Sequence, residues 1–234
     1  MINQVKISAL SLACLVFFTA VSAQALLYEF NTVISGATPG GPTPWLTAEF
    51  TNSQKTIGGT LINGVLLQLR APNLDTDPNK EFVTNWYFNN TLENDIEGLK
   101  FSFDLEGTAL AKKNYYPVDV NDLNAGAGAK FDVYFQFQTS NNNFNRFENG
   151  DYADIFMYGI EGLTADTFNA LSTSNIADKQ YLAEAHIQGI SPGDCSAWVV
   201  PGSPESVPEP GTMILLGTGL LGLAAYGRRR NSKR

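Results

Sequence analysis

The stretch Phe131-Asp132-Val133-Tyr134-Phe135-Gln136-Phe137-Gln138 alternates between apolar and more polar side chains at every step. Lys100-Phe101-Ser102-Phe103-Asp104-Leu105-Glu106 repeats the pattern. A period of two residues is typical of a β-strand with one buried face. Similar runs occupy Leu26 to Ile34, Trp45 to Thr51, Gly59 to Arg70, Phe82 to Phe88, Tyr152 to Ile160, Ala183 to Ile190 and Ala197 to Val200. Roughly nine strands predict an all-β fold, a two-sheet antiparallel sandwich of jelly-roll-like form.

Short sequence motifs predict a turn and a helix between the strands and a tether after them. Asn149-Gly150 separates two runs, and because both residues tolerate positive φ the pair predicts a hairpin turn. Thr164 is a candidate cap for one short helix over Ala165 to Leu171. The Pro- and Ser-rich residues 201–207 have the composition of an extended tether. We therefore expect one domain over residues 24–200, followed by a tether.

Charge and rare residues exclude several classes of function. The 234 residues carry a net charge of −8, and residues 24–207 alone hold nine basic and 22 acidic residues, a balance of −13. Such a body opposes binding to nucleic acid, since nothing offsets phosphate repulsion. His186 is the single histidine, so a multi-histidine metal site is excluded. Two cysteines, Cys14 and Cys195, are too few for a zinc knuckle or a disulfide scaffold.

The N-terminal residues 1–23 have the pattern of a secretory signal peptide. Lys6 precedes an apolar run, and small residues follow at Val21-Ser22-Ala23, so we expect signal peptidase to cleave after Ala23. Cys14 argues only weakly for a lipoprotein, because Ser11 stands where a lipobox requires Leu. Cleavage removes Cys14 and leaves Cys195 as the remaining thiol, which is free, buried or paired with another chain.

The C-terminus carries three elements in a fixed order. Pro208-Glu209-Pro210 comes first, and the uncharged run 211–227 follows, long enough at helical rise for a single transmembrane helix. A basic cluster ends the chain, consisting of Arg228, Arg229, Arg230, Lys233 and Arg234. The positive-inside rule keeps such a cluster in the cytoplasm, so the body lies outside. A permanent single-span anchor explains the run and the cluster but not the Pro-Glu-Pro element.

This arrangement at 208–234 resembles the PEP-CTERM sorting signal of Gram-negative bacteria. The resemblance implies recognition by an exosortase, with Pro208, Glu209 and Pro210 as the sorting motif and processing near it. It also implies transit through the inner membrane and delivery to the cell surface or the extracellular polymer matrix.

The body is similar to an extracellular β-sandwich domain that occurs ahead of such tails. The matching pieces are hydrophobic and turn elements at 45–48 and Phe50, 82–83 and 86–89, 145–147 and 150–151, 162–164, and 185–190 with 197–198. The resemblance implies a single sandwich domain and brings no catalytic residues with it.

Two weak patterns suggest ligand binding. Asp75, Asp77, Asn79 and Glu81 place oxygen ligands at alternate positions, a weak calcium candidate because Lys80 replaces the glycine of an EF-hand loop. Trp45, Trp86 and Trp198 are candidates for stacking on sugar rings, although aromatic residues in strands more often belong to the core.

His186 falls on a strand face together with Glu184 and Gln188, opposite Ala183, Ala185 and Ile187. No nucleophile signature accompanies it, so we expect a surface or hydrogen-bonded histidine.

These observations predict an exported surface or matrix protein with a structural or adhesive role and without catalysis or cofactor. A carbohydrate-binding module that associates with exopolysaccharide is the alternative, and an unrecognised hydrolase is a third hypothesis.

Overall fold

The computed structural model of the chain describes residues 25–76, 80–104, 118–140, 146–174, 180–193, 195–202 and 205–206. The predicted signal peptide (1–23), the Pro208-Glu209-Pro210 motif, the apolar run 211–227 and the basic cluster lie outside these residues. Within the described part, no helix is long and apolar enough to span a membrane.

Strands dominate the described residues. They are β1 (Ala25–Gly36), β2 (Leu46–Ile57), β3 (Thr60–Arg70), β4 (Phe82–Phe88), β5 (Lys100–Asp104), β6 (Val118–Asn124), β7 (Ala129–Gln136), β8 (Phe147–Glu148), β9 (Tyr152–Tyr158), β10 (Thr173–Ser174), β11 (Ala183–Ile190), β12 (Cys195–Pro201) and β13 (Glu205–Ser206). Three short 3-10 helices join them, η1 (Glu93–Gly98), η2 (Gly126–Gly128) and η3 (Ala165–Phe168). The all-β expectation is confirmed.

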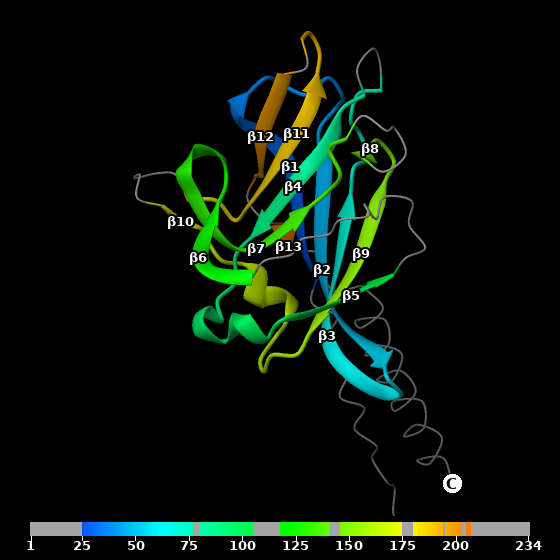
Figure 1. Cartoon of the computed structure of the whole chain (residues 1–234), viewed down its shortest axis with the longest axis vertical. Helices are drawn as coiled ribbons and strands as arrows, with labels where there is room; N and C mark the ends of the chain where they lie inside the picture. Colours follow the sequence, from blue (N-terminus) through cyan, green and yellow to red (C-terminus); the bar gives the residue numbers. More distant parts are fainter. Residues whose placement is uncertain are drawn as a thin grey trace, which may run out of the picture.

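All of these strands belong to one antiparallel sheet. Its main path runs β10-β7-β4-β11-β12-β1-β2-β3-β9-β5, and β13, β6 and β8 pair with β1, β7 and β4 (Figure 1). The two-sheet sandwich that we expected is therefore not confirmed, because hydrogen-bonded pairing continues from one half of the strand order to the other.

Aromatic contacts show that this sheet folds back on itself. Phe50 on β2 packs edge-on against Phe88 on β4 at 5.1 Å between ring centroids, although three strands separate β2 and β4 in the sheet. Phe101 on β5 meets Phe135 on β7 at 5.6 Å, from opposite ends of the strand order. The two halves of the sheet therefore face each other, and the hydrophobic core lies between them.

The β2–β3 hairpin continues beyond this core as an arm, which we define as residues 52–63 (Figure 1). Leu46, Ala48 and Phe50 on β2 are buried. The following positions on that strand face carry polar residues, Asn52 and Gln54, because no core remains to pack against. Gly58 and Gly59 close the turn with φ of 59° and 84°, values that favour glycine and suit a two-residue hairpin.

The predicted helix is shorter than expected and has a different cap. Only Ala165–Phe168 is helical, as a 3-10 turn, and the Thr164 side chain makes no capping hydrogen bond. Instead, Asn52 Oδ1 accepts a hydrogen bond from the backbone N–H of Ala165 at 2.7 Å. The cap comes from β2, so the local sequence around Thr164 did not contain the signal.

The turn at Asn149-Gly150 forms, with Gly150 at φ 84°, but the hairpin prediction is wrong. β8 before the turn pairs with β4, whereas β9 after it pairs with β3 and β5. The turn therefore carries the chain from one half of the folded sheet to the other.

The stretch predicted as a tether contributes to the sheet. Pro201 ends β12, and Glu205 and Ser206 pair with Leu27 and Leu26 of β1. The chain is thus held in the sheet almost as far as the Pro208-Glu209-Pro210 motif.

Phe50 is the core residue whose truncation we expect to be most costly. Its side chain is fully buried and contacts Tyr28, Phe88 and Phe168, the last in a stacked arrangement at 4.5 Å. Phe50→Ala should lower the free energy of unfolding by about 3–5 kcal/mol, measured by urea denaturation of the purified chain. Leu171→Ala is the matched control, because Leu171 is 56% exposed and should change stability by less than ~0.5 kcal/mol. Equal effects of the two substitutions would contradict the proposed core.

Candidate functional site

The three tryptophans do not form an exposed row for sugar stacking. Trp86 is fully buried and Trp45 is 5% exposed, with its Nε1 donating to the Gly41 carbonyl at 2.8 Å. Trp198 is half-buried, stacks on His186 at 4.4 Å and has the backbone of Gly126 against its ring. Trp45 and Trp86 are therefore corrected from candidate binding residues to core residues, since the folded-back sheet encloses both.

His186 and Cys195 lie apart. Thr84 Oγ1 is 2.8 Å from His186 Nδ1, and burial lowers the pKa of His186. His186 pairs across strands with Trp198, whereas Cys195 pairs with Ile190 at the far end of the ladder. Cys195 is exposed, and its Sγ donates to the Pro192 carbonyl at 3.3 Å. The expectation of a hydrogen-bonded histidine agrees with this placement.

The calcium candidate is described at two of its four positions, because Asp77 and Asn79 lie outside the described residues. Glu81 is 1% exposed, and its two oxygens accept hydrogen bonds from the backbone N–H groups of Gly40 and Asp75, each at 2.8 Å. Glu81 thus holds two loops together. Calcium binding at this loop stays a prediction.

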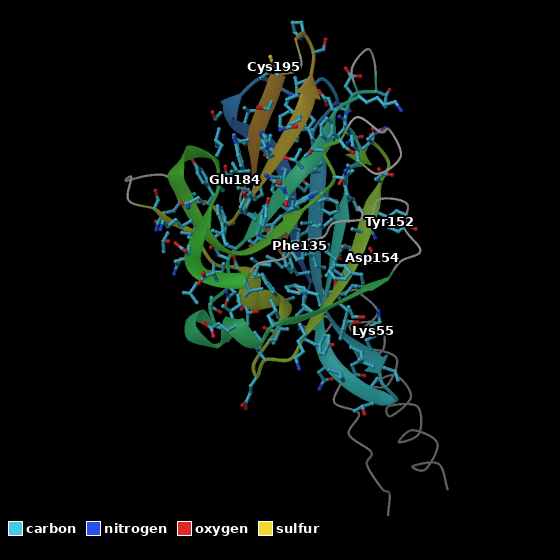
Figure 2. All side chains as sticks on the ribbon, in the orientation of Figure 1. Lys55, Phe135, Tyr152, Asp154, Glu184 and Cys195 are labelled. Carbon is cyan, nitrogen blue, oxygen red and sulfur yellow. The ribbon has the colours of Figure 1, made fainter. Side chains whose placement is uncertain are left out.

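An exposed aromatic ring lies instead on the outer surface of β3 and β9. Tyr152 is 37% exposed, and the guanidinium of Arg70, directly opposite on β3, lies 5.0 Å from its ring centroid. Arg70 also forms an ion pair with Asp154 at 2.6 Å. Gln68 Nε2 reaches the same carboxylate at 3.4 Å. We call Gln68, Arg70, Tyr152 and Asp154 the Tyr152 face; Figure 2 shows Tyr152 and Asp154 along β9, near the edge of the molecule.

A groove of about 450 Å³ lies beside the Tyr152 face. Its lining residues are Thr47, Arg70, Ala71, Pro72, Gly150 and Asp151. The turn at Gly150 is fixed there by two backbone hydrogen bonds, from Gly150 N–H to the Ala71 carbonyl and from Ala71 N–H to the Asp151 carbonyl. The surface therefore combines an aromatic ring, planar polar side chains and a fixed concave neighbour, the elements from which ligand sites are built.

A buried carboxyl group lies on the other side of the molecule (Figure 2). Glu184 on β11 has no solvent exposure, and neither of its oxygens has a hydrogen-bond partner among the described residues. Burial raises its pKa to about 8; the backbone N–H of Gly126 acts in the opposite direction but falls short of a hydrogen bond. Tyr87 and Tyr181 are the neighbours whose own pKa values Glu184 helps to raise.

Sequence reasoning missed both of these clusters. It placed Glu184 on the outer face of β11 correctly but did not show that Gly126 and Trp198 cover that face. The sequence pattern places Tyr152 at the start of a strand, and only the β3–β9 register places it opposite Arg70. The sequence signal closest to Tyr152 was the Asn149-Gly150 turn, because a residue that directly follows a turn often lies at the surface.

Comparison with known proteins identifies one motif in the chain. The PEP-CTERM protein-sorting motif matches residues 206–230, which include Pro208, Glu209 and Pro210. No curated protein and no solved structure matches the chain. The predicted sorting signal is therefore confirmed, and in the structure a β-rich domain precedes it.

Glu184 predicts a specific dependence of stability on pH. Its pKa is about 8 in the folded chain and near the ordinary 4.5 in the unfolded chain. Between these values the unfolded state loses the proton while the folded state keeps it, so the free energy of unfolding falls as pH rises and levels off above the folded pKa. Glu184→Gln should remove this component and be more stable than the unmodified chain above pH 8.

Urea denaturation across the pH range tests this prediction. Glu161→Gln is the control, because it makes the same change of side chain at an exposed position, where no buried carboxyl group is removed. A Glu184→Gln profile parallel to that of the unmodified chain would show that the carboxyl group is not held neutral.

Proposed function

We propose that this chain, which carries the PEP-CTERM sorting motif, is a structural or adhesive component of the cell surface or extracellular matrix and has no catalytic role. The motif implies export, an exosortase as the processing partner, and a surface or extracellular destination. The observation that carries the proposal is the position of the motif, which begins at Ser206, the last of the described residues and one that pairs with β1. The sorting tail is thus joined directly to a folded β domain.

The contacts and burial of three polar side chains, His186, Glu81 and Glu184, support a role without catalysis. His186 is hydrogen-bonded to Thr84 and stacked on Trp198, and Glu81 holds two loops. Glu184 is sealed from solvent. A general acid or base must reach its substrate, and these groups contribute to the scaffold instead.

Carbohydrate binding is a second candidate function, and the Tyr152 face favours it. A pyranose ring presents C–H groups that pack on an aromatic face and hydroxyl groups that bond to planar polar side chains. Tyr152 offers the ring, and Arg70, Asp154 and Gln68 are already oriented by their mutual contacts. Such preorganisation lowers the entropic cost of binding.

Replacing the sorting motif tests the leading proposal. A chain with Pro208→Ala, Glu209→Ala and Pro210→Ala should remain unprocessed in the membrane fraction of a host that encodes an exosortase. The unmodified chain should be recovered from the surface or matrix fraction. Immunoblots of the separated fractions report both outcomes.

The control is Ser232→Ala, which changes the tail after the matched motif and should be processed normally. Normal release of the triple variant would contradict the role that we assign to the Pro-Glu-Pro element.

A Tyr152→Ala substitution tests the second candidate. If saccharides bind at the Tyr152 face, the purified full-length chain should bind at least one glycan on an array, and Tyr152→Ala should weaken that binding by about 1–3 kcal/mol because ring stacking is lost. Tyr152→Trp keeps an aromatic face and should retain binding.

Leu171→Ala removes another exposed apolar side chain and should have no effect. Undiminished glycan binding by Tyr152→Ala would exclude the Tyr152 face.

A further inference from the structure

The arm begins where both ends of the folded domain meet. Ala25, the first described residue, pairs with Thr51 on β2, one position before the arm. Leu26 pairs with Phe50 on one side and with Ser206 on the other. The start of the sorting motif and the base of the arm therefore lie at the same end of the sheet, two strands apart.

The arm also points in the direction in which β13 runs. β13 is antiparallel to β1, and β1 is antiparallel to β2, so β13 runs parallel to β2. From Phe50, level with Ser206, to Ile57 at the end of β2, seven strand steps cover ~23 Å. From Ser206 to Gly211, where the apolar run starts, five residues span at most ~18 Å. The arm is thus longer than the greatest distance that these five residues can span.

The position of the arm is fixed at its base. The hydrogen bond from Ala165 N–H to Asn52 Oδ1 joins it to the start of η3. Between the arm and the loop at Leu163 and Thr164 lies a groove of about 500 Å³. Across the hairpin, Gln54 Nε2 donates to Asn63 Oδ1 at 2.7 Å. The arm is therefore a paired ribbon with a side-chain link between its strands.

The tip of the arm has the chemistry of a surface that meets lipid. Leu61 is 62% exposed, the most exposed large apolar side chain of the described residues, and Ile57 and Ile62 nearby are only half-buried. Residues 50–70 contain Lys55 and Arg70 and no acidic residue, whereas the body as a whole has a charge of −13. Apolar side chains flanked by a cation suit the interface of a bilayer, and the remainder of the acidic body is repelled by anionic lipids.

We propose that the arm is a membrane-contacting element whose tip, centred on Leu61, lies in the lipid interface while the C-terminal tail is still inserted. This inference rests on the proposed function, because it requires the apolar run 211–227 to be held in the bilayer. The arm and the tail then form two contacts with the same membrane. Two contacts fix the orientation of the body, so the Pro208-Glu209-Pro210 motif is presented to the processing enzyme in one orientation.

Site-specific fluorescence on the full chain tests this proposal. Cys14→Ser and Cys195→Ser give a background without other thiols. Leu61→Cys then places a polarity-sensitive dye at the tip of the arm. Ser191→Cys places the same dye in the turn between β11 and β12, far from the arm (Figure 1). The chains are reconstituted into vesicles of phosphatidylglycerol and phosphatidylcholine in equal amounts, with and without brominated acyl chains.

The expected result is a blue-shifted emission for the dye at position 61 and loss of most of that emission with brominated lipid, and neither change for the dye at position 191. Lys55→Glu should reduce the quenching at position 61, because it places an acidic group at the anionic surface. Lys55→Arg keeps the charge and should leave the quenching unchanged.

Flotation of the vesicles separates two kinds of failure. If the chain floats with the vesicles but the dye at position 61 is neither shifted nor quenched, the arm does not contact lipid, and the proposal for the arm is overturned while the sorting proposal stands. If the chain does not float with the vesicles, the tail is not inserted, and both proposals are overturned.

Discussion

The structure depends on one constraint: a single antiparallel sheet must bury its aromatic face against itself. Phe50 contacts Phe88 and Phe168, and Phe30 contacts Trp86 at 5.1 Å, so residues on β1 and β2 pack against β4 from across the interior. Because the inner face of the sheet forms the core, side chains on its outer face can contact solvent or a ligand. The Tyr152 face lies on that outer face, and the arm consists of the part of β2 and β3 that extends beyond the core.

The alternation of apolar and polar residues was enough to predict most of the strands. The bounds of β4 and β11 coincide with the predicted runs Phe82 to Phe88 and Ala183 to Ile190. β6 was not predicted, because its residues Asn121 and Asp122 interrupt the apolar pattern and its pairing with β7 shifts register. The burial of Glu184 was also missed, since alternation shows which residues share a face but not whether another segment covers that face.

The sorting signal can be predicted from the sequence alone, whereas the candidate binding surface cannot. The sorting signal consists of a short motif, an apolar run and a basic cluster, all contiguous, so the sequence alone identifies it. The candidate binding surface joins Gln68 and Arg70 to Tyr152 and Asp154, residues more than 80 positions apart in the chain. Only strand register brings them together. Trp45 and Trp86, two of the three tryptophans suggested as binding residues, lie in the core, because large aromatic rings fill it well.

The central claim is that an exported β domain is carried to the surface by a C-terminal tail that an exosortase then removes. The most direct measurement is the intact mass of the protein recovered from the surface of cells that produce the unmodified chain. Our account predicts one species that lacks residues 1–23 and ends near Pro208-Glu209-Pro210. A species that retains both Met1 and Arg234, or a C-terminal peptide that extends past Leu220, would contradict it.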